Sequence, residues 1–113
     1  KQKLDCFNQV EKLFDKFDFL ALPSAQIFPF DKKIQYPSEL NNKKLDTYHR
    51  WLEIFVMSSL LELPTVSVPI GFNINGSPMG IQIIGNKGDD LKLFSFAKKY
   101  EEVFNYSKTR PRF

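Results

Sequence analysis

Residues Leu63 to Gly85 read LPTVSVPIGFNINGSPMGIQIIG, and this segment carries the clearest strand and turn signals of the chain. Apolar residues alternate with small or polar ones over 66–70 and again over 79–84, a period of two that is typical of β-strands. Asn75-Gly76 lies between the two segments and is a strong hairpin signal, because both residues tolerate positive φ. The pattern predicts a β-hairpin in which Pro69, which has no N–H donor, lies where no ladder hydrogen bond is needed.

Upstream of the hairpin, apolar residues recur at spacings of three and four and predict a helix over about residues 3–16. They are Leu4, Phe7, Val10, Phe14 and Phe17. A short apolar run over 17–22 follows, and Pro23 closes it. Because the run is so short, we expect a strand buried on both faces rather than a helix.

Residues 24–45 contain Pro, Asn and Lys without periodicity, which predicts a long loop. Helical spacing then returns, with Asp46 as the expected N-cap, and Pro64 predicts that this second helix ends near Glu62. Asp89 or Asp90 is expected to cap a last helix. The inner stripe of that helix is predicted to comprise Leu91, Phe94, Ala97 and Val103 or Phe104. The order of elements predicts one α/β segment over 1–113, with a mixed sheet and a β-hairpin layered against about three helices.

The composition narrows the class of protein. The chain has 113 residues, 42% hydrophobic and 26% charged, and its net charge of +3 is spread over both halves, which argues against a nucleic-acid binder. The single cysteine excludes an internal disulfide and fits a cytoplasmic protein, and no apolar run is long enough for a membrane span. The 12 Phe and the missing initial Met favour a piece of a longer protein, with uncovered apolar surface that would pair two copies. The basic tail 108–112 is interpreted as a solvated end.

The sequence offers no complete catalytic constellation. We interpret Cys6 as a structural residue of the first helix, His49 as an exposed helix position and Ser58-Ser59 as small residues for helix packing. Asp89-Asp90 is better explained by helix capping than by metal binding. We therefore expect no catalytic residue, no metal ligand and no cofactor in this chain.

Taken together, several stretches resemble one family. The stretch 63–85 closely resembles the carboxy-terminal end of amidase signature enzymes, and residues 46–53, DTYHRWLE, look like the helix that precedes it in bacterial amidases. Residues 22–25, LPSA, loosely resemble the end of a family strand, and Asp89-Asp90-Leu91 with Tyr100-Glu101 look like the closing helix. The resemblance covers nearly the whole chain and implies a carboxy-terminal piece of the amidase signature fold.

In that family, a Ser–cis-Ser–Lys triad within a Gly/Ser-rich region cleaves amide C–N bonds. This sequence has no such region, so the resemblance implies a fragment that is inactive alone. The implied partners are the remainder of the amidase domain and, in the intact enzyme, a small amide substrate. Tyr48 and Trp51, at i and i+3, are candidates for the wall of an apolar acyl or aryl pocket, with core packing as the competing interpretation.

Two alternatives stay open. One is a fragment of a glutamine-dependent aminoacyl-tRNA amidotransferase from the same family, which we rank lower because residues 48–51 look more like the general amidases. The other is a stand-alone, non-catalytic module that binds a partner protein through its apolar face.

Overall fold

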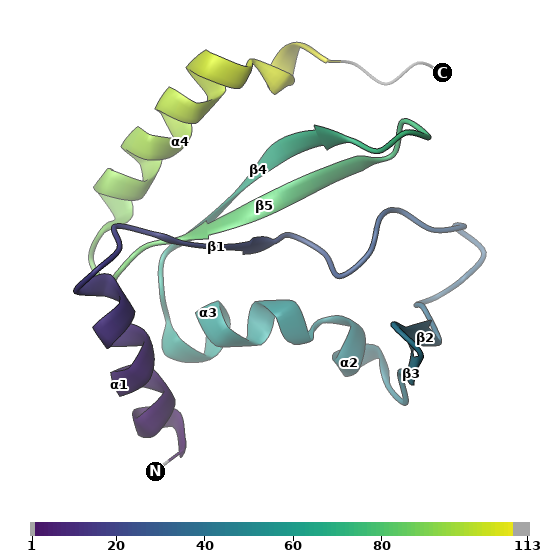
Figure 1. Ribbon diagram of the computed structural model, residues 1–113, viewed down its shortest axis with the longest axis horizontal. Helices are drawn as coiled ribbons and strands as arrows, with labels where there is room; N and C mark the ends of the chain where they lie inside the picture. The colour runs from purple at the N-terminus through teal and green to yellow at the C-terminus, as the bar shows by residue number, and fades with distance from the viewer. Residues whose placement is uncertain (1, 110–113) are drawn as a thin grey trace.

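The computed structural model describes residues 2–109 and arranges them in three layers (Figure 1). A three-stranded sheet lies between helix α4 on one face and helices α1 and α3 on the other. The helices and strands, in chain order, are α1 (Gln2–Phe14), β1 (Leu20–Pro23), β2 (Glu39–Leu40), β3 (Lys43–Lys44), α2 (Tyr48–Trp51), α3 (Val56–Leu61), β4 (Thr65–Phe72), β5 (Pro78–Ile84) and α4 (Asp90–Phe104). Short 3-10 turns, η1 (Glu53–Phe55) and η2 (Tyr106–Lys108), follow α2 and α4. The predicted α/β class, with a hairpin layered against helices, is confirmed.

Strands β4 and β5 form the predicted hairpin. Its loop is closed by the Asn73 N–H donating to Ser77 O and by the Gly76 N–H donating to Asn73 O, both at 2.9 Å. Gly76 takes the left-handed position with φ of 78°, as such loops require. Pro69 lies on an edge strand, as expected, and the register shifts between Pro69 and Gly71, which leaves a bulge there.

Strand β5 is central, with β4 on one side and β1 on the other, and every pairing in this sheet is antiparallel. The expectation of a mixed sheet is therefore wrong for the described residues, because β1 and β4 run in the same direction but are separated by β5. Burial of β1 on both faces is wrong too. Leu20 and Leu22 are half-buried, whereas Ala21 and Pro23 are exposed because α4 packs over β4.

Two small apolar clusters hold the layers together. The cluster beneath α1 and α3 comprises Val10, Leu61, Leu63 and Ile84, and the cluster beneath α4 comprises Val68, Ile83 and Leu93. Cys6, Phe7 and Phe14 are half-buried against the first cluster, which confirms the apolar stripe of the first helix. Phe17 lies beyond the end of α1 and is exposed, and the side chain of Leu4 lies outside the described part of the chain.

The predicted inner stripe of α4 is wrong in phase. Leu91, Phe94 and Val103 are 82%, 66% and 66% exposed, whereas Leu93 is buried and Ala97 packs beside it. The helix carries apolar residues on two sides, so the helical period alone does not select the side that faces the sheet. Asp89 is the N-cap, one of the two expected positions.

The predicted second helix is broken. Helix α2 ends at Trp51, the 3-10 turn η1 follows, and α3 begins at Val56. Thr47, with an extended backbone, is the N-cap in place of Asp46. Helix α3 ends where Glu62 takes a left-handed φ of 57°, close to the predicted end.

The loop over 24–45 is irregular as predicted, except for one short hairpin. Strand β2 pairs with β3 through a turn in which Asn41 and Asn42 both have positive φ, at 49° and 61°. Two successive residues of this kind are typical of a type I′ turn. Of the basic tail 108–112, residues 110–112 lie outside the described residues.

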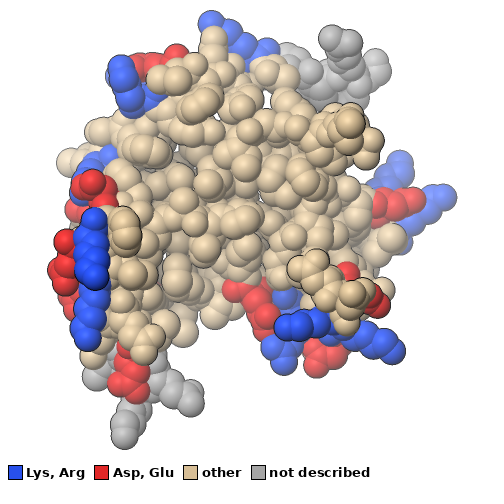
Figure 2. Space-filling view, in the orientation of Figure 1, with Lys and Arg blue, Asp and Glu red and all other residues tan. Residues whose placement is uncertain are grey.

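The molecule is flat and exposes much surface. Its extents are 43 × 39 × 17 Å and its radius of gyration is 16.1 Å, against about 13 Å for a compact domain of this length. The accessible surface is 8835 Å², whereas a compact 13.2 kDa protein exposes about 6,400 Å². In the view of Figure 2, charged side chains lie around the rim and uncharged side chains fill the middle. Surface of this extent is typical of a segment that packs against further protein.

Candidate functional site

Four aromatic rings gather where α2 meets the 24–45 loop. The ring of Trp51 lies edge-on to Phe30 with centroids 5.6 Å apart, and the ring of Tyr48 lies edge-on to Tyr36 at 6.0 Å. Each sequence candidate therefore pairs with one ring of the loop, and we call the two pairs together the aromatic wall: Phe30, Tyr36, Tyr48 and Trp51. Tyr48 is 47% exposed and Phe30 37%, so ring surface is available to an apolar group from outside.

Side-chain amides from two other segments hold the chain next to the wall. The Gln26 amide, in the loop, donates from Nε2 to the carbonyls of Arg50 and Trp51 at 2.8 and 2.6 Å. The Gln82 amide, on β5, donates from Nε2 to the carbonyls of Pro23 and Ile54 at 3.0 and 3.1 Å. These contacts tie the break between α2 and α3 to the loop and to the sheet.

Gln82 is the most conspicuous polar side chain of the sheet, because it is 2% exposed. Its Nε2 uses both hydrogens, while its Oε1 accepts no hydrogen bond from the described residues. The reverse orientation of the amide would set Oε1 against two carbonyl oxygens. Leaving a buried acceptor unpaired costs about 1–3 kcal/mol, so the two donated hydrogen bonds fix this orientation at a real cost.

A pair of serine hydroxyls crosses the sheet beside Gln82. Ser24, just beyond β1, and Ser67, on β4, lie with their Oγ atoms 2.6 Å apart above Gly80 of β5. A Cβ at Gly80 would lie 2.9 Å from the Oγ of Ser24, so only glycine leaves room for the pair. Next to Ser67 and Gly80 the sheet surface carries a shallow hollow, also lined by Val68, Pro69, Pro78 and Met79.

Charged residues flank α2 on its exposed side. The Arg50 guanidinium lies 2.6 Å from Glu53 Oε1 and 3.4 Å from Asp46 Oδ1. The hydrogen bond to Glu53, together with the charges of Glu53 and Asp46, raises the pKa of Arg50. Because solvent screens exposed ion pairs, we expect this group to orient α2 rather than to add much stability.

Within this site, no described side chain that could act as a general base lies next to a possible nucleophile. The Ser58 hydroxyl donates to the Phe55 carbonyl at 3.3 Å, and Cys6 is half-buried in the first core cluster. The His49 ring is exposed, as the sequence predicts, and the structure places it edge-on to Tyr48. Within residues 2–109, no group of three His, Cys, Asp or Glu side chains could hold a metal ion, and no helix is long and apolar enough to cross a membrane.

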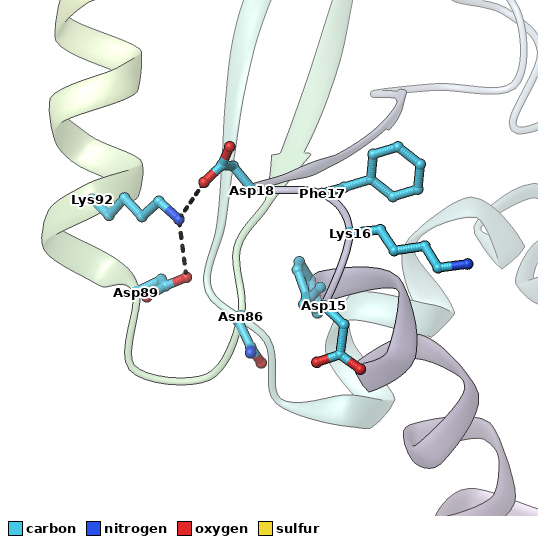
Figure 3. Close-up of a pocket in the computed structure, with 8 residues that line it drawn as sticks. Asp15, Lys16, Phe17, Asp18, Asn86, Asp89 and Lys92 are labelled. Atoms are coloured by element: carbon cyan, nitrogen blue, oxygen red, sulfur yellow. Dashed lines mark hydrogen bonds and ion pairs between the residues drawn. The ribbon is translucent and has the colours of Figure 1, made fainter.

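A separate, polar cleft of about 200 Å³ lies at the other end of the sheet (Figure 3). The Lys92 amine points to Asp18 and Asp89, with its Nζ 2.8 Å from Asp18 Oδ1 and 4.0 Å from Asp89 Oδ2. The hydrogen bond from Lys92 lowers the pKa of Asp18 and the same contact raises the pKa of Lys92. The cleft adjoins the start of β1, whereas the aromatic wall is tied to its end at Pro23, so the two do not form one site.

Sequence reasoning put forward Tyr48 and Trp51 as candidates, but it did not point to the residues that the structure places beside them. Phe30, Tyr36 and Gln26 lie in a loop without periodicity, which carries no signal for their placement. Gln82 did carry a signal, because the period of two in β5 puts it on the same face as buried Ile84. A polar residue at a buried strand position calls for a specific partner.

The comparisons with known proteins agree on one family. A sequence profile of the family described as Amidase matches residues 1–94. The chain is 33% identical over 107 residues to a glutamyl-tRNA(Gln) amidotransferase subunit of Thermodesulfovibrio yellowstonii, covering 92% of this chain and 20% of that protein. It is 29% identical over 102 residues to the subunit of the same name from Streptococcus sanguinis, covering 88% of this chain and 19% of that protein.

A solved structure shares the fold. It is a bacterial aryl acylamidase of the amidase signature enzyme family, with a TM-score of 0.81 and 26% sequence identity. The match covers 97% of this chain and 24% of the solved one. The chain thus spans about one fifth of the length of the curated relatives that it matches.

Proposed function

Since the chain belongs to the amidase family, we propose that residues 1–113 form the carboxy-terminal segment of an enzyme that hydrolyses amide C–N bonds. The observation that carries the proposal is the match of nearly the whole fold to about a quarter of an amidase signature enzyme. Within that enzyme the segment would contribute scaffold and one wall of the substrate pocket, while the nucleophile and its base would come from the remainder of the domain.

We propose Tyr48 and Trp51 as pocket residues for an apolar acyl or aryl group. The rings of the aromatic wall pair edge-on, and Phe30 and Tyr48 are partly exposed, which suits contact with a flat or aliphatic substituent. The hydrogen bonds from Gln26 and Gln82 give the segment a fixed position, as a binding wall needs. No metal or cofactor is part of this proposal.

The proposed partner of the exposed surface is the remainder of the amidase domain. The excess of accessible area over a compact protein is about the size of an obligate interface. A homodimer formed through the same surface is the competing arrangement for the isolated segment. A cytoplasmic location completes the proposal, supported by a sequence with one cysteine and no disulfide.

The test compares the full-length gene product with the isolated 113-residue chain. We expect the full-length protein to hydrolyse acetanilide or benzamide, measured as released aniline or ammonia, and the isolated chain to release neither above the buffer rate. Trp51→Ala in the full-length protein should raise KM for the ring-bearing amide at least about tenfold, which corresponds to about 1.4 kcal/mol of lost contact. Turnover by the purified isolated chain that vanishes on changing one of its own serines would refute the proposal.

The similarity to amidotransferase subunits favours a second candidate, a glutaminase segment that serves aminoacyl-tRNA. An assay of glutamine-dependent conversion of glutamyl-tRNA separates the two, because that branch would show it and a general amidase would not. A stand-alone interaction module is the third candidate. It would be favoured if the open reading frame of the gene starts near Lys1 with no upstream Gly/Ser-rich segment.

A further inference from the structure

The break between α2 and α3 leaves backbone carbonyls that a continuous helix would satisfy. In an unbroken α-helix the carbonyls of residues 50, 51 and 54 would accept hydrogen bonds from N–H groups four residues later. Here the 3-10 turn η1 intervenes, and the Phe55 N–H donates to the Leu52 carbonyl instead. Three of the affected carbonyls, those of Arg50, Trp51 and Ile54, accept hydrogen bonds from Gln26 or Gln82.

The two glutamines anchor the break at different places. Gln26 belongs to the loop that also supplies Phe30 to the aromatic wall, so its hydrogen bonds join the two sides of that wall. Gln82 belongs to the central strand and binds the end of β1 and η1 with one amide nitrogen. The position of Trp51 relative to the sheet thus depends on both amides.

We propose that Gln26 and Gln82 are positioning residues that set the aromatic wall and thereby the preference of the enzyme for ring-bearing amides. This inference rests on the proposed function for its substrate class. Neither glutamine is proposed to touch the reacting atoms. Each acts through the backbone at residues 50–54, and the donated hydrogen bonds are what matter rather than side-chain volume.

Methionine tests this directly, because it is close to glutamine in size but donates no hydrogen bond. Gln26→Met and Gln82→Met are compared, in the full-length gene product, with Gln9→Met as the matched control. Gln9 lies exposed on α1, away from the wall. The substrates are acetanilide and benzamide, which carry a ring, and acetamide, which does not.

We expect both test variants to raise KM for a ring-bearing amide at least about tenfold, with kcat changed less than twofold. The KM for acetamide should stay within about twofold of wild type, and Gln9→Met should match wild type throughout. Gln82→Asn restores the donor on a shorter side chain, and Gln82→Glu keeps the length without the donor. The KM for the ring-bearing amide should therefore be closer to wild type in Gln82→Asn than in Gln82→Glu. An equal loss of kcat on all three substrates would overturn the inference, because that is what general damage to the fold produces.

Hydrogen exchange read by mass spectrometry gives a second measurement that needs no activity. We expect exchange at residues 48–56 to be at least about tenfold faster in Gln26→Met and Gln82→Met than in Gln9→Met. If Gln82→Met also loosens residues 78–84, Gln26→Met decides the matter, because Gln26 lies outside the sheet. Unchanged exchange at 48–56 in Gln26→Met would overturn the positioning role. A wild-type protein that hydrolyses no amide would instead overturn the proposed function, and the exchange result would still stand.

Discussion

At the scale of the residue, Gly80 decides whether three strands can be bridged. The hydroxyls of Ser24 and Ser67 meet across β5 only because Gly80 has no side chain between them. The resulting contact joins the chain just beyond β1 to β4, two strands that do not pair with each other. The missing side chain at Gly80 therefore lets the two serines link the outer strands at this end of the sheet.

We predict that Gly80→Ala destabilises the full-length protein by about 1–3 kcal/mol, the usual cost of inserting a carbon into a packed site. The added Cβ would lie 2.9 Å from the Ser24 Oγ and force the hydroxyl pair apart. Urea denaturation measures the loss. The double variant Ser24→Ala, Gly80→Ala removes the clashing oxygen and should recover part of it. Equal stability of Gly80→Ala and wild type would contradict the described contact.

At the scale of the element, the bulged edge of β4 is closed by two tyrosines. The hydroxyl of Tyr100 donates to the Pro69 carbonyl at 2.9 Å, and that of Tyr106 donates to the Ile70 carbonyl at 3.1 Å. Both carbonyls lie at the register shift, where the ladder is interrupted. The end of α4 and the turn after it thus cover backbone groups that an edge strand otherwise exposes.

We predict that Tyr100→Phe lowers the free energy of unfolding by about 0.5–1.5 kcal/mol at pH 7, the typical value of one hydrogen bond. Burial raises the pKa of Tyr100, with smaller contributions from Tyr106 and Glu101, so the folded state holds this proton more tightly than the unfolded state. The contribution is complete below about pH 10, the ordinary value for tyrosine, and is lost as pH rises through the raised pKa. Thermal unfolding followed from about pH 7 to about pH 11 should show a steeper loss in wild type than in Tyr100→Phe. Parallel curves would contradict the prediction.

The sequence predicts some of these elements and not others, for physical reasons. The predicted hairpin and first helix are confirmed, because the Asn-Gly turn signal marks the hairpin and an apolar stripe marks the helix. The predicted stripe of α4 was right for Ala97 but wrong for Leu91 and Phe94, because Leu93 faces the sheet in their place and only the tertiary contacts choose between these apolar residues. The prediction of one continuous second helix failed because the break after Trp51 depends on side-chain amides far away in the sequence.

The candidate site divides in the same way. Local spacing puts Tyr48 and Trp51 on one helical turn, so sequence alone suggests them. Their ring partners come from the loop, at Phe30 and Tyr36, and no periodicity predicts where an irregular segment lies. Gln82 is the instructive case, since its buried strand position was visible in the sequence although its two acceptors were not.

At the scale of the whole molecule, the chain covers too little of its own apolar surface. The outer side of α4 exposes Leu91, Phe94 and Val103, and the sheet buries only two small clusters. A flat shape with more than a third of surface in excess fits a segment that is completed by neighbouring protein. The same surface should make the isolated segment associate with itself.

We predict that the isolated 113-residue chain forms dimers or larger species in a concentration-dependent way, measured by sedimentation velocity. Phe94→Lys should shift the distribution toward monomer, because it places a charge in the exposed apolar surface of α4. Ser95→Lys is the control, since it adds the same charge at an exposed polar position of that helix. A clean monomer at high concentration would count against the prediction.

The two edges of the sheet are unequal, and this limits how copies can join. Tyrosine hydroxyls occupy carbonyls of β4, while no strand of the described residues lies beyond β1. A filament can grow by edge-to-edge pairing only if both edge strands of every copy are free to pair with another strand. Because the two tyrosines cover part of the β4 edge, we expect copies of the isolated chain to pair through β1 in preference to β4, which would disfavour filaments.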